Sequence, residues 1–254
     1  MQLIDTHCHL DFPQFDNIRA SIIDAAASVG VSGIIVPGVT AKEWRRLLTI
    51  VASRPSLHAA LGLHPCFLSH HSDNDLSLLE REVAREDVCA IGEIGLDFFI
   101  QNPNVDMQLF FLQKQLALAL AFDLPVLLHV RKAHDQMLKE LRRIKLPKGG
   151  IVHAFSGSEQ QARQYLSLGF RLGVGGTVTY ERAKKLRKIV STLPLESFVL
   201  ETDAPDMPLS SYRDEVNQPA RVLEVASCIA SIKACSVEEV AAATTGQALQ
   251  LVGL

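Results

Sequence analysis

The chain has 254 residues, of which 48% are hydrophobic and 21% are charged, and this composition excludes a mainly disordered protein. Its 25 basic and 28 acidic residues give a formal net charge of −3, which excludes a strongly basic chain that binds nucleic acid through bulk charge.

The five cysteines are scattered and include no CxxC pair, so we expect no disulfide framework and a reducing, cytoplasmic location. The first residues have no basic segment followed by an apolar stretch, so no signal peptide is expected. No apolar run approaches the roughly 18 residues of a membrane helix. We therefore expect no membrane association.

Eight short apolar runs that are rich in β-branched residues predict buried strands. In chain order they span residues 2–6, 33–37, 57–63, 88–94, 125–130, 150–154, 170–174 and 198–202. Amphipathic stretches lie between these runs. The first extends from about Gln14 to Gly30, where a glycine suits a left-handed helix end. Ser156 and Glu159 have the spacing of a capping box, for a helix that ends at Gly169.

The eightfold alternation of strand and helix predicts an α/β fold, a (β/α)8 TIM barrel formed by a single domain over residues 1–254. The alternative is a doubly wound open sheet, which usually has a glycine fingerprint after its first strand. Here that turn reads His7-Cys8-His9. The residues beyond about Asn217 are expected to add two or three helices.

Residues with metal-ligating side chains occur where five of the predicted strands end. In a barrel, these carboxyl ends meet at one rim, where active sites lie. The six residues of this kind are His7, His9, Glu93, His129, His153 and Asp203. They suffice for two divalent ions with one carboxylate bridging, and imidazole and carboxylate ligands suit Mg²⁺, Mn²⁺ or Zn²⁺.

Each of these residues also has a structural interpretation. A single histidine at a strand end is often only a hydrogen-bonded residue, but six ligand-type residues at the same end of five strands are hard to explain by packing. His7 and His9 point the same way along a strand, so Cys8 between them should face apolar surroundings. Asp5 either orients His7 or caps the turn. The basic runs at 139–145 and 182–188 are expected to be solvated helix faces.

Six motifs occur in order along the chain: DTHCHLD at 5–11, GLHP at 62–65, GEIGLDF at 92–98, LLHVRKA at 127–133, IVHAFSG at 151–157 and ETDAP at 201–205. With them the chain resembles the TatD family of metal-dependent deoxyribonucleases, a branch of the amidohydrolase-like barrels, over essentially its whole length. The resemblance implies that His7, His9, Glu93 and Asp203 hold one metal ion. It also implies that Glu93, His129 and His153 hold a second, with Glu93 bridging.

Two segments depart from the family pattern. Thr244-Thr245-Gly246-Gln247-Ala248 stands where the family often has a TTxNF-like segment, which puts any role of that Asn-Phe pair in doubt. Phe98-Phe99 stands where a tyrosine frequently follows the aspartate. Neither departure touches the expected ligands.

The expected function is therefore that of a divalent-metal-dependent hydrolase, a TatD-like 3′–5′ deoxyribonuclease in which a hydroxide generated at the metal pair attacks phosphorus. Asp203, with Glu93, is the expected catalytic residue and accepts the proton of the water. His64 and Arg131 are expected on the rim, outside the ligand set, in contact with substrate phosphates. The partner is then DNA or another phosphodiester, and no stable protein partner is evident.

Two other functions stay open. The same binuclear site is suited to hydrolysis of a small-molecule ester, amide, lactone or phosphoester, because one fold hosts many reactions. The second of these functions is that of an inactive metal-binding barrel that serves as an interaction partner. The complete ligand set argues against this last one.

Overall fold

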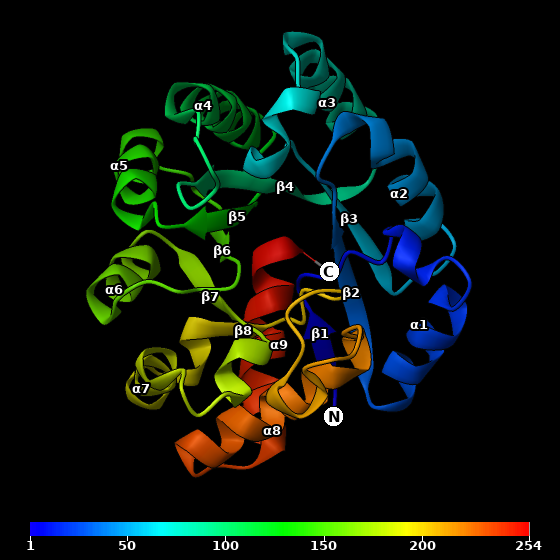
Figure 1. The fold of residues 1–254 in the computed structure, drawn as a ribbon, viewed down its shortest axis with the longest axis vertical. Helices are drawn as coiled ribbons and strands as arrows, with labels where there is room; N and C mark the ends of the chain where they lie inside the picture. Colours follow the sequence, from blue (N-terminus) through cyan, green and yellow to red (C-terminus); the bar gives the residue numbers. More distant parts are fainter. Residues whose placement is uncertain (254) are drawn as a thin grey trace.

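Eight parallel strands, each hydrogen-bonded to the next in chain order, form a barrel in the computed structural model, which describes residues 1–253 (Figure 1). The strands are β1 (Leu3–Asp5), β2 (Val31–Pro37), β3 (Leu57–Leu61), β4 (Val88–Asp97), β5 (Val126–Arg131), β6 (Gly150–Val152), β7 (Phe170–Val174) and β8 (Phe198–Leu200). All eight predicted strands and the predicted TIM barrel are confirmed. Leu254, the last residue of the predicted domain, lies outside the described residues.

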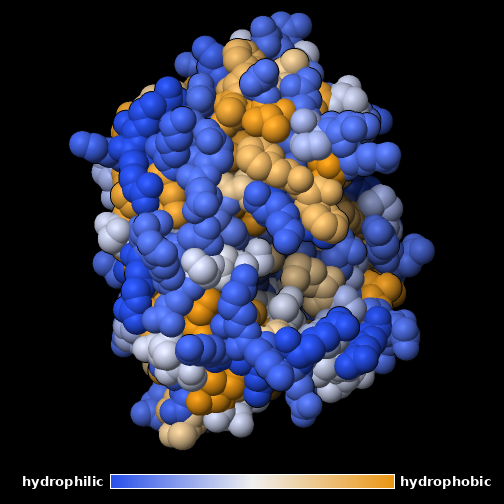
Figure 2. All heavy atoms as spheres, turned by 60° about the vertical axis from the view of Figure 1, so that its left-hand side comes forward, coloured by the Kyte–Doolittle hydropathy of each residue, from blue (hydrophilic) through white to orange (hydrophobic). Residues whose placement is uncertain are grey.

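Helices surround the barrel and cover one end of it (Figure 1), and the face of the molecule in Figure 2 is mostly hydrophilic with apolar groups between. They are α1 (Arg19–Ser28), α2 (Trp44–Val51), α3 (Asp73–Arg85), α4 (Val105–Ala121), α5 (His134–Ile144), α6 (Glu159–Ser167), α7 (Lys184–Thr192), α8 (Val222–Lys233) and α9 (Val237–Val252). Within residues 1–253, no helix combines the length and the apolar character needed to cross a membrane.

The barrel closes where the first strand meets the last. The backbone N–H of Thr6 donates to Leu200 O at 2.9 Å, and the N–H of Asp203 donates to His7 O at 2.8 Å. Asp5 reinforces this seam, because its carboxylate accepts hydrogen bonds from the backbone N–H groups of His7 and Thr202. The sequence left open whether Asp5 orients the His7 ring or caps the turn. The structure supports the cap, because Asp5 accepts from the backbone N–H of His7.

A small apolar cluster fills one end of the barrel. Alternate side chains of the strands, such as Ile4, Ile35 and Leu127, point inward and pack on Ala248 and Val252 of α9. Figure 1 accordingly shows α9 near the centre of the ring of strands. With this end plugged, the opposite end, where the strands finish, is the one that carries polar side chains.

Of two helix ends predicted from the spacing of residues, one is confirmed and one is wrong. Gly30 has a φ of +97° and ends α1 as predicted. The predicted capping box at Ser156 and Glu159 is wrong, because Ser158 caps α6 and pairs with Gln161. Ser156 lies outside the helix, with its Oγ 3.4 Å from His134 Nε2.

Candidate metal centre

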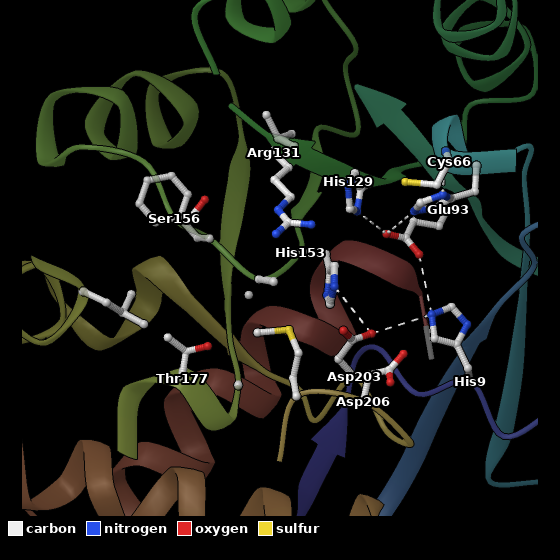
Figure 3. A pocket seen from close by; sticks show the side chains of 18 of the residues that line it. His9, Cys66, Glu93, His129, Arg131, His153, Ser156, Thr177, Asp203 and Asp206 are labelled. Atoms are coloured by element: carbon white, nitrogen blue, oxygen red, sulfur yellow. Dashed lines mark hydrogen bonds and ion pairs between the residues drawn. The ribbon is translucent and has the colours of Figure 1, made fainter. Parts of the chain in front are cut away.

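Six side chains from five strand ends meet at the carboxyl end of the barrel (Figure 3). They are the residues that the sequence singled out as ligands: His7, His9, Glu93, His129, His153 and Asp203. Apart from His7, which is fully buried, they line a cavity of about 770 Å³. The convergence follows from the parallel arrangement, since every strand delivers its last residues to the same rim.

His7 and His9 present their Nε2 atoms to two carboxylates. These atoms lie 3.1 and 3.6 Å from Glu93 Oε2, and 3.7 and 3.6 Å from Asp203 Oδ1. Ligands that are about 2.0–2.2 Å from a divalent ion lie about 3–3.6 Å from one another. His7, His9 and Glu93 have ligand atoms within 4.8 Å of one another, and so have His7, His153 and Asp203, so each group of three is compact enough to hold an ion.

Glu93 faces imidazoles with both of its oxygens. Its Oε2 faces His7 and His9, while its Oε1 lies 3.3 Å from His64 Nε2 and 3.1 Å from His129 Nδ1. Burial alone would raise the pKa of Glu93, but the facing histidines hold it well below its usual value. An ionised carboxylate that turns one oxygen toward each of these two pairs of histidines is suited to bridge two ions.

His153 joins the cluster through Asp203. Its Nε2 lies 3.5 Å from Asp203 Oδ1, and its ring stacks on that of His7 with 3.6 Å between centroids. Burial would lower the pKa of His153, but the charges of Glu201 and Asp203 raise it well above its usual value. Because a metal ligand must be a neutral imidazole, an ion that binds here displaces a proton.

Two carboxylates that the sequence analysis missed lie behind these histidines. Asp97 Oδ2 is 2.9 Å from His129 Nε2, and Glu201 Oε1 is 3.0 Å from His153 Nδ1. Burial would lower the pKa of His129, but Asp97 and Glu93 raise it to about 9. A carboxylate on the second ring nitrogen fixes the ring and turns the first nitrogen toward the site. Asp97 follows Glu93 by four residues and Glu201 precedes Asp203 by two. This closeness to two predicted ligands is the feature of the sequence by which both carboxylates could have been identified.

The two predicted substrate contacts occupy different surroundings. His64 is buried against Glu93 rather than on the open rim, and its Nδ1 accepts a hydrogen bond from the backbone N–H of Cys66 at 3.1 Å. Arg131 is exposed, and its guanidinium lies 3.9 Å from the centroid of the Phe99 ring. In Figure 3, Arg131 points into the cavity between the histidine cluster and Ser156.

Further cations come from the start of α7 and the loop before it. Arg182 and Lys185 line the cavity, and Lys185 Nζ donates to Ser156 O at 2.6 Å. The expectation of a solvated face for 182–188 therefore holds for only part of that run. Figure 3 places Ser156 and Thr177 on the side of the cavity away from His9 and Glu93. The cavity thus extends from an anionic and imidazole-rich wall to one where cations lie among apolar side chains.

Comparisons with known proteins agree with this geometry. Residues 4–253 match the family model described as TatD related DNase. YjjV of Escherichia coli K12, an uncharacterized metal-dependent hydrolase, is 44% identical over 244 residues, which cover 95% of this chain and 94% of YjjV. The crystal structure of the E. coli K12 TatD homolog YJJV is 43% identical, with a TM-score of 0.96, and the match covers 99% of this chain and 98% of that one.

A more distant relative has a more specific name. The 3′-5′ ssDNA/RNA exonuclease TatD of Erwinia amylovora is 30% identical over 259 residues, which cover 99% of this chain and 100% of that protein. The family model spans nearly all of the described residues, and the relatives match over almost their full lengths. This chain belongs to the TatD family of metal-dependent hydrolases.

Proposed function

We propose that this protein is a metal-dependent deoxyribonuclease that removes nucleotides from the 3′ end of single-stranded DNA. The observation that carries the proposal is the cavity itself, in which His and carboxylate side chains lie on one wall while Arg131, Arg182 and Lys185 lie among apolar side chains elsewhere in the lining. Cations beside a metal centre suit a polyanion, and they occur here in a chain whose net charge is negative. The name of the Erwinia relative points to the same class of substrate.

We assign one divalent ion to His7, His9, Glu93 and Asp203, and a second to the other oxygen of Glu93, with His129 and His153. When bound, such ions activate water and neutralise charge on phosphate. Asp203 is the carboxylate assigned to take the proton from the attacking water. Its side chain is 15% exposed, against 3% for Glu93, and neighbouring histidines lower its pKa against the effect of burial, so that it is ionised at neutral pH.

The aromatic and cationic residues of the cavity are assigned to the DNA strand. The Arg131 guanidinium lies over the Phe99 ring, and its fork of N–H groups is suited to two parallel hydrogen bonds to a phosphate. Phe12 stacks on His9 with 4.5 Å between ring centroids and lines the same cavity. A nucleobase can stack on such a ring whatever its identity, which suits a nuclease without sequence preference.

The test is the degradation of a 5′-labelled single-stranded DNA oligonucleotide after chelation and return of Mg²⁺ or Mn²⁺. We expect a ladder of shortened products from the wild type, and a loss of at least about 100-fold in rate for Asp203→Asn. Asp87→Asn, which changes an exposed carboxylate just before the start of β4 and outside the cavity lining, is the matched control and should retain the wild-type rate. An intact oligonucleotide, or an active Asp203→Asn protein, would contradict the proposal.

The cavity volume favours one second candidate. About 770 Å³ lies within the roughly 300–1,000 Å³ of small-molecule sites, so a small ester, amide, lactone or phosphoester would also fit. Panels of such substrates, assayed with the same Asp203→Asn control, would identify this activity if the oligonucleotide stays intact.

A further inference from the structure

One acidic side chain of the cavity has no part in the assigned metal centre. Asp206 lies in the loop that follows β8, and its backbone N–H donates to Asp203 O at 2.8 Å. The side chain of Asp206 is exposed and lines the cavity. It belongs neither to the ligand sets that the family resemblance implies nor to any compact group of metal-ligating side chains within residues 1–253. The metal centre therefore leaves this carboxylate without a role.

Asp206 lies on the side of the cavity away from the cations. Figure 3 shows it beside Asp203 and on the same side as His9, whereas Arg131 lies across the cavity. His9 is also the residue on which the Phe12 ring stacks, so an aromatic face and the carboxylate of Asp206 are both neighbours of this histidine. In the part of the chain that the structure describes, no basic side chain pairs with Asp206. The surroundings of Asp206 therefore differ in charge from those of Arg131.

A carboxylate without a cationic partner is unexpected in a cavity for a polyanion, because like charges repel each other. A substrate phosphate beside Asp206 is destabilised, since no basic side chain offsets the two charges there. A hydroxyl group, by contrast, donates a short and strong hydrogen bond to a carboxylate. A DNA strand has a free sugar hydroxyl at its 3′ end, one nucleotide from the linkage that a 3′ exonuclease cuts. At every internal position a phosphate replaces this hydroxyl.

We propose that Asp206 recognises the 3′ end of the strand: its carboxylate accepts a hydrogen bond from the terminal 3′-hydroxyl and repels a phosphate at the same position. This inference rests on the proposed nuclease function and assigns the place of the terminal nucleotide in the cavity. The terminal sugar lies at Asp206 and its base on Phe12, while the rest of the strand extends toward Arg131 and Lys185.

The repulsive part of this contact restricts cleavage to strand ends. A binding site gains specificity when it destabilises the wrong ligand as well as when it stabilises the right one. A strand that continues beyond the cleaved linkage brings a phosphate to Asp206, whereas a strand that ends there brings a hydrogen-bond donor. One carboxylate therefore accounts for the choice of the 3′ end without any contact to the bases.

The experiment compares three 5′-labelled single-stranded oligonucleotides of one sequence, which end in a 3′-hydroxyl, a 3′-hydrogen or a 3′-phosphate. The rate of removal of the first nucleotide is measured with Mn²⁺ and with substrate below saturation. Burial and the charge of Asp203 raise the pKa of Asp206, so the comparison is made at pH 8. We expect the wild type to cleave the 3′-hydroxyl end at least about tenfold faster than the other two, because they lack a hydrogen bond to a charged group.

Asp206→Asn keeps the size of the side chain and removes its charge. In this variant we expect the rate for the 3′-phosphate end to rise to within about threefold of that for the 3′-hydroxyl end, because an amide does not repel a phosphate and can donate a hydrogen bond to it. Asp87→Asn, outside the cavity lining, should keep the wild-type ratio.

The ratio of the two rates separates this inference from the nuclease proposal. Equal wild-type rates for the 3′-hydroxyl and 3′-phosphate ends, or an unchanged ratio in Asp206→Asn, overturn the role of Asp206 and leave the nuclease in place. A wild-type protein that degrades none of the three oligonucleotides contradicts the proposed function, and the inference falls with it.

Discussion

At the scale of single residues, the centre depends on carboxylates that orient the histidines. Glu201 Oε1 accepts a hydrogen bond from the backbone N–H of Ala154 at 2.7 Å and lies 3.0 Å from His153 Nδ1. The chain leaves space for it, since a Cβ on Gly173 would lie 2.2 Å from Glu201 Oε2. The orientation of His153 thus depends on the buried carboxylate of Glu201 and on Gly173, whose lack of a side chain leaves room for that carboxylate.

Replacing this carboxylate with an amide should weaken metal binding without unfolding the protein. For Glu201→Gln we expect a loss of about 10–100-fold in affinity for the divalent ion, because the amide no longer supports the orientation and basicity of His153. Isothermal titration of the chelated protein with Mn²⁺ or Zn²⁺ measures the change. Glu196→Gln, on the exposed turn before β8, is the control that keeps wild-type affinity. Unchanged affinity in Glu201→Gln would mean that the contact does not act through His153.

At the scale of elements, the start of α7 divides its cations between two environments. Both Lys184 and Lys185 are exposed, but only Lys185 is among the residues that line the cavity. The sequence predicts a solvated basic face for the run 182–188. The amphipathic period of a helix does not show which side of its first turn faces the rim of the barrel. Only the tertiary position of α7 beside Ser156 distinguishes the two lysines.

The two lysines form a matched pair for a binding experiment. Lys185→Gln should weaken binding of a single-stranded oligonucleotide and reduce the dependence of log affinity on log salt by about one ion, because one phosphate contact is lost. Lys184→Gln should change neither quantity. Fluorescence anisotropy at several salt concentrations, in the absence of catalytic metal, measures both. If the two variants behave alike, α7 does not contact the strand.

The elements themselves were largely predictable from the sequence. Continuous β-branched runs identified all eight strands because strands buried on both faces are apolar throughout. The alternation of strands and helices then placed six ligand-type residues at one rim. The start of α6 was misplaced, since Ser156 and Ser158 both have a partner three residues later and only the backbone decides between them. The position of His64 against Glu93 was missed because a short helix, not a strand, orients it.

The atypical C-terminal segment also needed tertiary structure for its interpretation. Thr245 Oγ1 donates to Gln2 O at 2.9 Å, and Gln247 Oε1 accepts from Arg171 Nε at 2.6 Å. Both contacts fasten α9 to the beginnings of β1 and β7, at the plugged end of the barrel. The segment that departs from the family pattern therefore lies at the end of the barrel away from the cavity.

At the scale of the whole molecule, a buried histidine away from the ligand cluster should limit stability in acid. His134 contacts Tyr165 Oη and Ser156 Oγ, and burial lowers its pKa to about 4, with the charge of Lys185 acting in the same direction. Between pH 6.5 and 4 the unfolded chain binds a proton at this residue that the folded protein does not. The free energy of unfolding must therefore fall as the pH falls through this range, by up to about 3 kcal/mol from His134.

Urea denaturation from pH 7 to pH 4.5 checks this contribution. In His134→Gln the loss of stability across the range should be smaller than in the wild type by about 1–3 kcal/mol, because one proton fewer is taken up on unfolding. His70→Gln, on the exposed end of the helix Pro65–His70, is the control that should keep the wild-type slope. Equal slopes in wild type and His134→Gln would show that folding does not lower the pKa of His134.

The seam between β1 and β8 has a consequence for the assembly of the metal centre. His7 and Asp203 are 196 residues apart in the sequence, and the backbone bond from Asp203 to His7 joins the two. A chain in which this seam is open holds His7 and His9 apart from Asp203. The complete set of assigned ligands therefore exists only once the first and last strands of the barrel have met.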